Sequence, residues 1–321
     1  MMQEAIKNFP KQLAWEPAIE NFEGLEKKRG FIVAGMGGSH LAADLLPIVD
    51  PAINLGIHKD YGLPVMPDSE LKNYLLIASS YSGNTEETID AFLAAGKKKM
   101  ARAVVSIGGK LLELAQKEKV PYVRVPDTKI QPRSALGFVF KSLLKLMGNE
   151  RALSDVGKIV ISPAALEPAG KALAERLKGF VPVIYASQRN AAIANNWKIK
   201  FNETGKVPAF HNVFPEVNHN EMTGFDIQSA TQKLIKPFYF IILKDAEDPL
   251  RIQKRMEILA GLYKDRGLSV ETIMLSEKNV YQRIFSSLIL ADWTAFYTAI
   301  GYGTEPEQVP MVEEFKRLIN S

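Results

Sequence analysis

The segment Gly30-Phe-Ile-Val-Ala-Gly-Met-Gly-Gly-Ser39 decides how the first half of the chain folds. Its short apolar run ends in glycine, a pattern typical of a buried parallel strand that leads into a tight turn. An apolar helical pattern follows at residues 41–46. The order recurs at Tyr74–Ala78, where a second apolar run leads through Ser79–Thr85 into a predicted helix that begins at Glu86. Strands that alternate with helices predict an α/β fold, in which a mostly parallel sheet is flanked by helices.

The alternation of predicted strands and helices continues along the whole chain. Its 321 residues suggest two domains, at roughly 150 residues per domain. In the first half we expect a helix at about 3–28, strands at 53–58, 101–107 and 122–125, and a helix at 136–147. In the second half we expect strands at 181–186, 206–211, 237–243 and 269–275, and helices at 189–201, 251–266, 282–300 and 312–319. The polar residues 149–157 are predicted to be a linker. We therefore predict two domains of similar fold, at residues 1–148 and 149–321.

Composition excludes several classes of function. The chain has no cysteine, so a disulfide scaffold, a cysteine zinc site and a cysteine nucleophile are impossible. It has only four histidines, and we therefore expect neither a metal nor another cofactor. A net charge of +4 is too small for the basic face of a dedicated nucleic-acid-binding protein. We see no signal peptide and no apolar run near the ~20 residues that span a bilayer, so we expect no membrane partner and a cytoplasmic location.

The glycine-rich turn Gly35–Ser39 is the first candidate site. Glycines such as Gly38 let the backbone approach a ligand, and the exposed N–H groups at the start of the next helix favour an anion. A G-x-G-x-x-G dinucleotide fingerprint would need glycine where His40 stands, so the sequence does not favour a nicotinamide cofactor. The alternative is a tight strand-to-helix turn without a ligand.

The loop Ser79–Thr85 is the second candidate site. Ser80, Ser82 and Thr85 offer three hydroxyls at the start of a helix, which suits a phosphate monoester. The loop lacks the lysine of a nucleoside triphosphate site. The alternative is a serine-rich turn with Thr85 as its N-cap. Two such loops at the carboxyl ends of strands favour the site, because ligands of open α/β sheets bind at that edge.

Together these two loops resemble the sugar isomerase (SIS) domain over about residues 20–148. That domain binds phosphosugars through its serine and threonine loop. The resemblance implies that the substrate phosphate is held by Gly38, Ser39, Ser80, Tyr81, Ser82 and Thr85.

Two later segments extend the resemblance to nearly the whole chain. Trp197-Lys-Ile-Lys-Phe-Asn-Glu203 and Phe214-Pro-Glu-Val-Asn-His-Asn-Glu221 are similar to the W-K-x-x-x-N-E and F-P-E-x-N-H-N-E segments of bifunctional phosphoglucose/phosphomannose isomerases. The resemblance implies two SIS domains, a phosphosugar substrate, chemistry without a metal, and a homodimer with shared active sites.

The resemblance also implies roles for an acid and a histidine. Glu203 would be the base that moves a proton between C1 and C2 of the sugar through an enediolate, which a carboxylate can do. His219, contributed by the neighbouring subunit, would open the sugar ring, since histidine exchanges protons near neutral pH. The alternatives are a solvated helix-end acid for Glu203 and a hydrogen-bonded structural residue for His219. His211 lies in an apolar strand pattern, and we expect it to be structural.

Two cations complete the candidate site. Lys316 lies in a C-terminal segment that resembles the P-V-x-x-I-x-x-L-K helix of the family, whose lysine assists ring opening. Arg133 matches the family's P-R-x-x-x-G segment, with Gly137 keeping the spacing, and would stabilise an enediolate electrostatically. The alternatives are a solvated lysine on an amphipathic helix and a surface arginine that caps a turn.

The sequence thus predicts an isomerase that interconverts glucose 6-phosphate, and also mannose 6-phosphate, with fructose 6-phosphate. One alternative is an amino-sugar phosphate isomerase, which usually carries a glutamine-hydrolysing domain with an N-terminal cysteine. Another is a non-catalytic phosphosugar-binding regulator, which would bring a DNA-binding module and a basic face. The chain has no cysteine and only a small positive charge, so the isomerase is the favoured interpretation.

Overall fold

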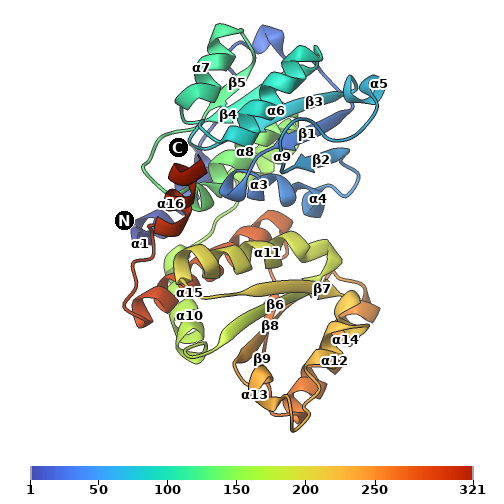
Figure 1. Ribbon diagram of the computed structural model, residues 1–321, viewed down its shortest axis with the longest axis vertical. Coiled ribbons are helices and arrows are strands. Elements are labelled where there is room, and N and C mark those ends of the chain that lie inside the picture. Colours follow the sequence, from blue (N-terminus) through green and yellow to red (C-terminus); the bar gives the residue numbers. More distant parts are fainter. Residues whose placement is uncertain (1, 320–321) are drawn as a thin grey trace. The chain divides into compact units, whose positions relative to one another are not determined.

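A computed structural model describes residues 2–319, which form two compact units (Figure 1). The N-terminal unit is Asn8–Val160. The C-terminal unit is residues 161–319 together with the first helix, α1 (Met2–Lys7). The units divide after residue 160 rather than after 148, because α9 (Glu150–Gly157) packs against α8 (Leu136–Leu146) and α2 (Phe9–Ala14).

The N-terminal unit is built on a parallel sheet with the strand order β2-β1-β3-β4-β5. Its strands are β1 (Gly30–Ala34), β2 (Leu55–His58), β3 (Tyr74–Ser79), β4 (Ala101–Ser106) and β5 (Tyr122–Arg124). The chain runs outward from β1 in both directions, so the loops after β1 and β3 lie next to each other at the carboxyl edge of the sheet. This is the position at which open α/β sheets bind their ligands.

Helices cover both faces of this sheet. One apolar core joins alternate residues of the strands to α6 and α7, and contains Ile32, Leu76, Phe92, Val104 and Leu111. On β4 and β5 the sheet also packs against α8, which in turn contacts α2, α3 and α9. The remaining helices of the unit are α3 (Leu41–Asp44), α4 (Leu46–Val49), α5 (Asp68–Leu71), α6 (Glu86–Lys97) and α7 (Gly109–Lys117).

The C-terminal unit has a second parallel sheet, with the order β7-β6-β8-β9. Its strands are β6 (Val181–Ser187), β7 (Phe210–Phe214), β8 (Phe238–Asp245) and β9 (Ser269–Leu275). Its order repeats that of the first four strands of the N-terminal unit, so β6 corresponds to β1 and β8 to β3. The predicted α/β class, with two similar sheets flanked by helices, is confirmed.

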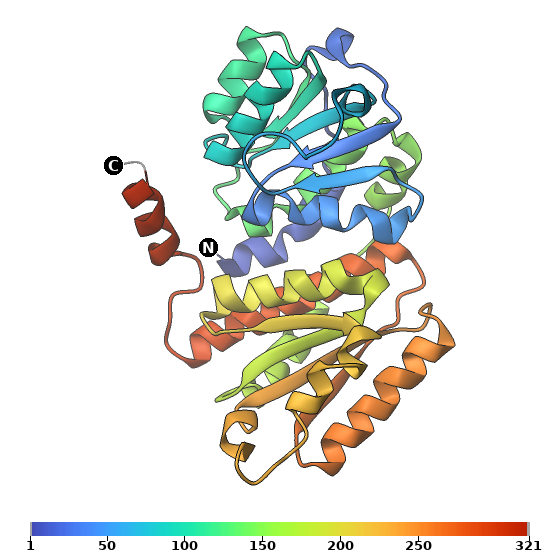
Figure 2. The same cartoon turned by 45° about the vertical axis from the view of Figure 1, so that its right-hand side comes forward.

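Helices also cover both faces of the second sheet (Figure 2). An aromatic core under α14 contains Tyr185, Phe214, Phe240 and Tyr263. The other group of helices is centred on α15, which packs against α10, α11 and α1. The helices are α10 (Pro163–Arg176), α11 (Ala191–Lys200), α12 (Glu221–Gly224), α13 (Gln232–Ile235), α14 (Leu250–Asp265), α15 (Val280–Gly301) and α16 (Pro310–Ile319).

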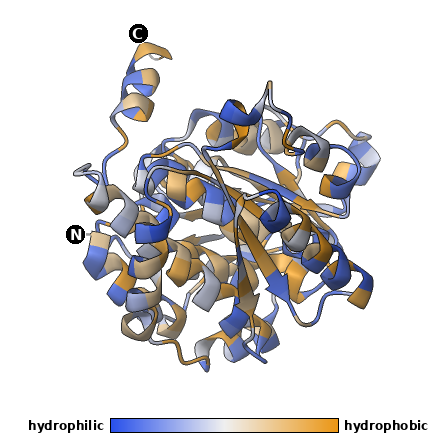
Figure 3. Ribbon diagram, turned by 90° about the horizontal axis from the view of Figure 1, so that it is seen from below, coloured by the Kyte–Doolittle hydropathy of each residue, from blue (hydrophilic) through white to orange (hydrophobic). Residues whose placement is uncertain are grey.

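Hydropathy explains the layering of each unit. Figure 3 shows hydrophobic residues along the strands, and helices that alternate between hydrophobic and hydrophilic positions. By length and composition α15 is apolar enough to cross a membrane, which corrects the expectation that no run approaches that length. However, 67% of its apolar window is buried, as expected for the core helix of a folded unit.

Three sequence predictions differ from the structure. The helix expected at 3–28 is broken into α1 and α2. The second helix begins at Phe9 with Pro10 in its first turn, and the chain after Ala14 is extended. The expected linker 149–157 is the helix α9, which buries Leu153 and Val156 and is capped by the Asn149 side chain. The strand expected at 206–211 begins later, as β7.

Candidate active site

The glycine-rich turn after β1 is folded closely against two other segments. Ser39 ends a 3-10 helix at Gly37–Ser39 and is buried. Its hydroxyl accepts a hydrogen bond from the Tyr81 N–H at 3.0 Å, and its carbonyl accepts one from the Ser79 hydroxyl at 2.8 Å. A Cβ on Gly38 would come within 2.7 Å of the backbone nitrogen of Arg133. Glycine at position 38 therefore permits the close approach of three loops at the carboxyl edge.

The loop after β3 gathers its hydroxyls at the start of α6. Ser80 is fully buried, and its hydroxyl lies 2.8 Å from that of Thr85 and accepts the Gly83 N–H at 3.1 Å. Ser82 is exposed, and its hydroxyl accepts the Asn84 N–H at 3.3 Å. Gly83 has a φ of 74°, and a Cβ there would lie 1.8 Å from the Gly108 carbonyl oxygen, so only glycine fits.

Thr85 occupies the N-cap position of α6 but makes no side-chain cap hydrogen bond. Its hydroxyl pairs with Ser80 instead. The first N–H groups of a helix need an acceptor, and an anion can supply it. The structure therefore does not support the alternative in which Thr85 simply caps a turn. Thr85, Ser80 and the start of α6 form a polar corner of hydroxyls and N–H groups suited to a phosphate.

Two further predicted residues lie near this corner. Tyr81 is buried, and burial raises the pKa of its hydroxyl to about 12, so this group stays protonated at neutral pH. Arg133 lies in a 3-10 helix at Pro132–Ser134 and is only 1% exposed. The interpretation of Arg133 as a surface arginine is therefore wrong. The backbone of Arg133 lies beside Gly38, and its side chain is buried within the unit.

Glu203 lies in the C-terminal unit, in a π-helix at Phe201–Gly205 that continues α11. Its side chain is half-buried, while Phe201 and Thr204 on either side are fully buried. The Lys206 ammonium donates to the Glu203 carbonyl at 2.6 Å and also to the Gln308 carbonyl. Single π-turns inside helices occur frequently at functional sites.

His219 lies in a different part of the same unit. It follows the 3-10 helix at Glu216–Asn218, which packs against β7 and α12, and its side chain is exposed. Its polar neighbours are tied to the protein: Asn220 donates to Glu216 at 2.6 Å, and Glu221 accepts from the Tyr185 hydroxyl at 2.6 Å. The segment that carries His219 is thus held in place while the imidazole faces outward.

His211 and Lys316 complete the predicted set. His211 lies on β7, half-buried, with its Nδ1 buried and unpartnered. Burial, together with the nearby Lys198, lowers the pKa of His211, against the opposing effect of Glu221. Lys316 lies on α16, and its ammonium is 2.7 Å from the Glu313 carboxylate.

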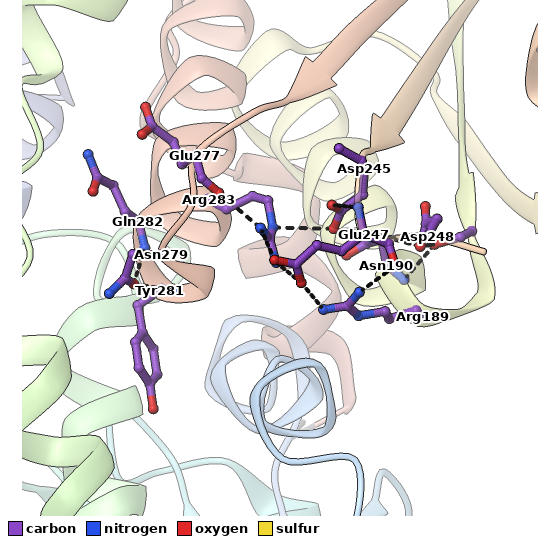
Figure 4. A network of polar contacts seen from close by, with 12 residues as sticks. Arg189, Asn190, Asp245, Glu247, Asp248, Glu277, Asn279, Tyr281, Gln282 and Arg283 are labelled. Carbon is purple, nitrogen blue, oxygen red and sulfur yellow. Dashed lines mark hydrogen bonds and ion pairs between the residues drawn. The ribbon is translucent and has the colours of Figure 1, made fainter. Parts of the chain in front are cut away.

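A partly buried ionic network at the carboxyl ends of β6 and β8 was not predicted (Figure 4). Arg283 pairs with Asp245 at 3.3 Å and with Glu247 at 2.8 Å, and Arg189 pairs with Glu247 at 3.0 Å. These arginines, Arg283 first, lower the pKa of Glu247, while burial raises the pKa of Asp248. These strand ends correspond to those that carry the hydroxyl loops in the N-terminal unit, but their charges neutralise one another. The available sequence signal was the run of acids directly after the apolar strand β8.

The described residues 2–319 contain no group of three or more His, Asp or Glu side chains arranged to hold a metal ion. The polar groups described above are hydroxyls, backbone amides, carboxylates and cations. Such groups suit an anionic sugar and proton transfer.

Comparisons with known proteins define the class. Residues 167–319 match the family model described as the bacterial phospho-glucose isomerase C-terminal SIS domain. The fold also superposes on the C-terminal domain of glucosamine-fructose-6-phosphate aminotransferase from Francisella tularensis with a TM-score of 0.70. That likeness is at 14% identity and covers 96% of this chain and 98% of that one. The C-terminal half of the chain is thus similar to an SIS domain.

Relatives of known activity narrow the class to a family. A bifunctional phosphoglucose/phosphomannose isomerase from Aquifex aeolicus is 31% identical over 98% of this chain and 96% of its own. Another, from Caldicellulosiruptor bescii, is 32% identical over 98% of both. A D-glucosamine-6-phosphate 4-epimerase from Sulfolobus acidocaldarius is 30% identical over 68% of this chain and 71% of its own. The chain belongs to the bifunctional phosphoglucose/phosphomannose isomerase family, which confirms the family predicted from the sequence.

Proposed function

We propose that this protein is an aldose–ketose isomerase that interconverts glucose 6-phosphate and mannose 6-phosphate with fructose 6-phosphate. The observation that carries the proposal is the match to isomerases of this name over 98% of the chain. The hydroxyl loops support it, because Ser80 and Thr85 meet at an uncapped helix start where a phosphate monoester would be stabilised. The phosphate contacts in this proposal are Gly38, Ser39, Ser80, Tyr81, Ser82 and Thr85.

In the proposed reaction, Glu203 removes the C2 proton of the open-chain aldose. The electron pair forms the C1–C2 double bond and the carbonyl electrons move onto O1, which gives an enediolate. The proton of the O2 hydroxyl then passes to O1, and Glu203 returns its own proton to C1, which gives the ketose. C1 is reduced and C2 is oxidised within one substrate molecule, so the reaction needs no external oxidant or reductant. Return of the proton to the opposite face of C2 accounts for the mannose epimer.

Three further side chains assist in this proposal. His219 and Lys316 exchange protons with the ring oxygen and the anomeric hydroxyl during ring opening. Arg133 stabilises the negative charge of the enediolate, and its burial makes that charge worth more than it would be in water.

The assembly in this proposal is a cytoplasmic homodimer in which His219 completes the site of the neighbouring subunit. The outward-facing imidazole supports that arrangement. Apolar side chains on α16 support it as well, because exposed apolar patches mark interaction surfaces. The large apolar residues exposed on this helix are Met311, Val312, Phe315, Leu318 and Ile319.

The test is a direct assay of purified protein with fructose 6-phosphate in excess chelator, following glucose 6-phosphate and mannose 6-phosphate separately. Formation of both products is expected. No turnover would refute the isomerase proposal, and formation of glucose 6-phosphate alone would refute dual specificity.

An amino-sugar substrate is the second candidate, favoured by the likeness to the glucosamine-phosphate epimerase. The same assay with D-glucosamine 6-phosphate tests it, with NMR to detect a change at C4. Conversion faster than that of fructose 6-phosphate would favour this candidate over the first.

A further inference from the structure

The last residue of α11, Lys200, forms a buried ion pair with Asp292 in the middle of α15. The ammonium nitrogen lies 2.6 Å from the carboxylate, and the two side chains are 2% and 8% exposed. Two charges removed from water in this way add little net stability, because desolvation offsets their attraction. A pair of apolar side chains would hold the two helices together as well. A buried pair here therefore points to a geometric role.

The position of the pair suggests what that role is. The π-helix that carries Glu203 begins at Phe201, the residue directly after Lys200. One turn earlier, the Trp197 indole donates to the Ser287 hydroxyl at 3.0 Å. The last turn of α11 is thus fastened to α15 at two points, which fixes both its rotation and its height along that helix.

The π-helix is also held from its far side. Its buried residues pack against α15, where Gly205 lies next to Ala295. Lys206, with a φ of 58°, ends the turn and donates to the Glu203 carbonyl at 2.6 Å. A π-turn holds more residues than an α-turn, so relaxation to a regular helix would point Glu203 in another direction.

We infer that the Lys200–Asp292 pair is a positioning element that fixes the direction of the Glu203 carboxylate. This inference rests on the proposed function, in which Glu203 is the base. Proton transfer needs the carboxylate within hydrogen-bond reach of a carbon-bound hydrogen, and small misplacements are costly to that step. Substrate binding depends on the phosphate loops of the other unit and is expected to be affected much less.

The test replaces both charges with apolar groups, in Lys200→Met/Asp292→Leu, so that no unpaired charge is left buried. We expect a folded protein with an unchanged thermal midpoint, a KM for fructose 6-phosphate within about threefold of wild type, and kcat lower by about 100-fold. The primary isotope effect with C2-deuterated glucose 6-phosphate should rise, because the misaligned proton transfer becomes the slow step. A folded double variant with wild-type kcat and isotope effect would overturn the inference.

A second variant, Asp292→Glu, tests the same inference if the double variant does not fold. Asp292→Glu keeps the charges but lengthens one partner, so it should also lower kcat without raising KM. Wild-type kcat in that variant would equally count against the inference.

The matched control is Lys141→Met in the N-terminal unit. The Lys141 ammonium is also fully buried, where it donates to the Leu13 carbonyl at 2.8 Å and pairs with Glu16 at 2.9 Å. This change should lower stability and leave kcat unchanged. An equal loss of kcat in Lys141→Met would show that any buried lysine has this effect, and would overturn the assignment.

Wild type and Glu203→Gln are assayed alongside these variants. Inactive wild type refutes the proposed function and the positioning role with it, and active Glu203→Gln refutes the base. If wild type turns over, Glu203→Gln does not, and the pair variants match wild type, only the positioning role fails.

Discussion

Glu203 has a main-chain setting that an ordinary helix would not provide. Its turn is a π-helix, its carbonyl accepts a hydrogen bond from the Lys206 ammonium, and Phe201 and Thr204 in the same turn are buried. A solvated helix-end acid needs none of these supports. The residue-scale picture is therefore of one half-buried carboxylate on a rigid support, which is the arrangement that a base acting on a carbon acid requires.

His211 gives a prediction about pH. Its folded-state pKa is lowered, first by burial and then by Lys198, so the unfolded chain binds a proton at a higher pH than the folded one. Stability linked to this group is complete above the unfolded pKa of about 6.5 and is lost as pH falls below it. In urea denaturation from pH 7.5 to 5.5, wild type should lose stability more steeply than His211→Gln. Parallel curves would show that His211 does not titrate in this way.

At the scale of elements, the loop between β3 and α6 is built for an anion. Thr85 occupies the N-cap position of α6, but its side chain makes no cap hydrogen bond. Gly83 lies so close to the Gly108 carbonyl that no larger residue fits there. The buried Ser80 hydroxyl joins the two ends of the loop. These features leave the helix start open to a phosphate, whose charge the helix dipole stabilises.

We expect Ser80→Ala/Thr85→Ala to raise the KM for fructose 6-phosphate by about 10²- to 10⁴-fold, because two lost hydrogen bonds to a charged group, at about 1.5–3 kcal/mol each, weaken binding by about 3–6 kcal/mol. The effect on kcat should be smaller. The control is Ser142→Ala, which removes a hydroxyl bonded only within α8, to the Phe138 carbonyl. Steady-state kinetics and inhibition by inorganic phosphate give the measurement. Unchanged KM and phosphate inhibition in the double variant would mean that the phosphate binds elsewhere.

The elements also show what the sequence could and could not predict. Buried parallel strands such as β3 and β8 were predictable, because short apolar runs that end in glycine or polar turns are typical of buried strands. The helix α9 was missed because its few apolar residues are spread among charges. The Lys200–Asp292 pair could not be predicted, because it joins helices that are far apart in sequence and only the folded unit brings them together.

At the scale of the whole molecule, two units repeat one strand order and have diverged at the carboxyl edge of their sheets. The N-terminal unit carries hydroxyls and a buried arginine there, whereas the C-terminal unit carries carboxylates neutralised by Arg189 and Arg283. Both arginines at that edge are already paired with carboxylates, so neither is available to a phosphate. We therefore expect one phosphate site per chain, on the N-terminal unit.

The proposed dimer gives a prediction at this scale. Glu203→Gln and His219→Ala should each be inactive alone, yet after subunit exchange in an equal mixture they should recover about a quarter of wild-type activity. Half of the dimers would then be mixed, and each mixed dimer would hold one intact site. Absence of recovery, with subunit exchange shown by mass spectrometry, would contradict sites shared between subunits.

The most direct test of the central claim follows fructose 6-phosphate by NMR with wild type and with Glu203→Gln. The account predicts that wild type forms glucose 6-phosphate and mannose 6-phosphate. It predicts that Glu203→Gln forms both more slowly by a factor of about 10² to 10⁴, the usual contribution of a general base, while still binding fructose 6-phosphate in calorimetry. Wild-type rates in Glu203→Gln would contradict the account.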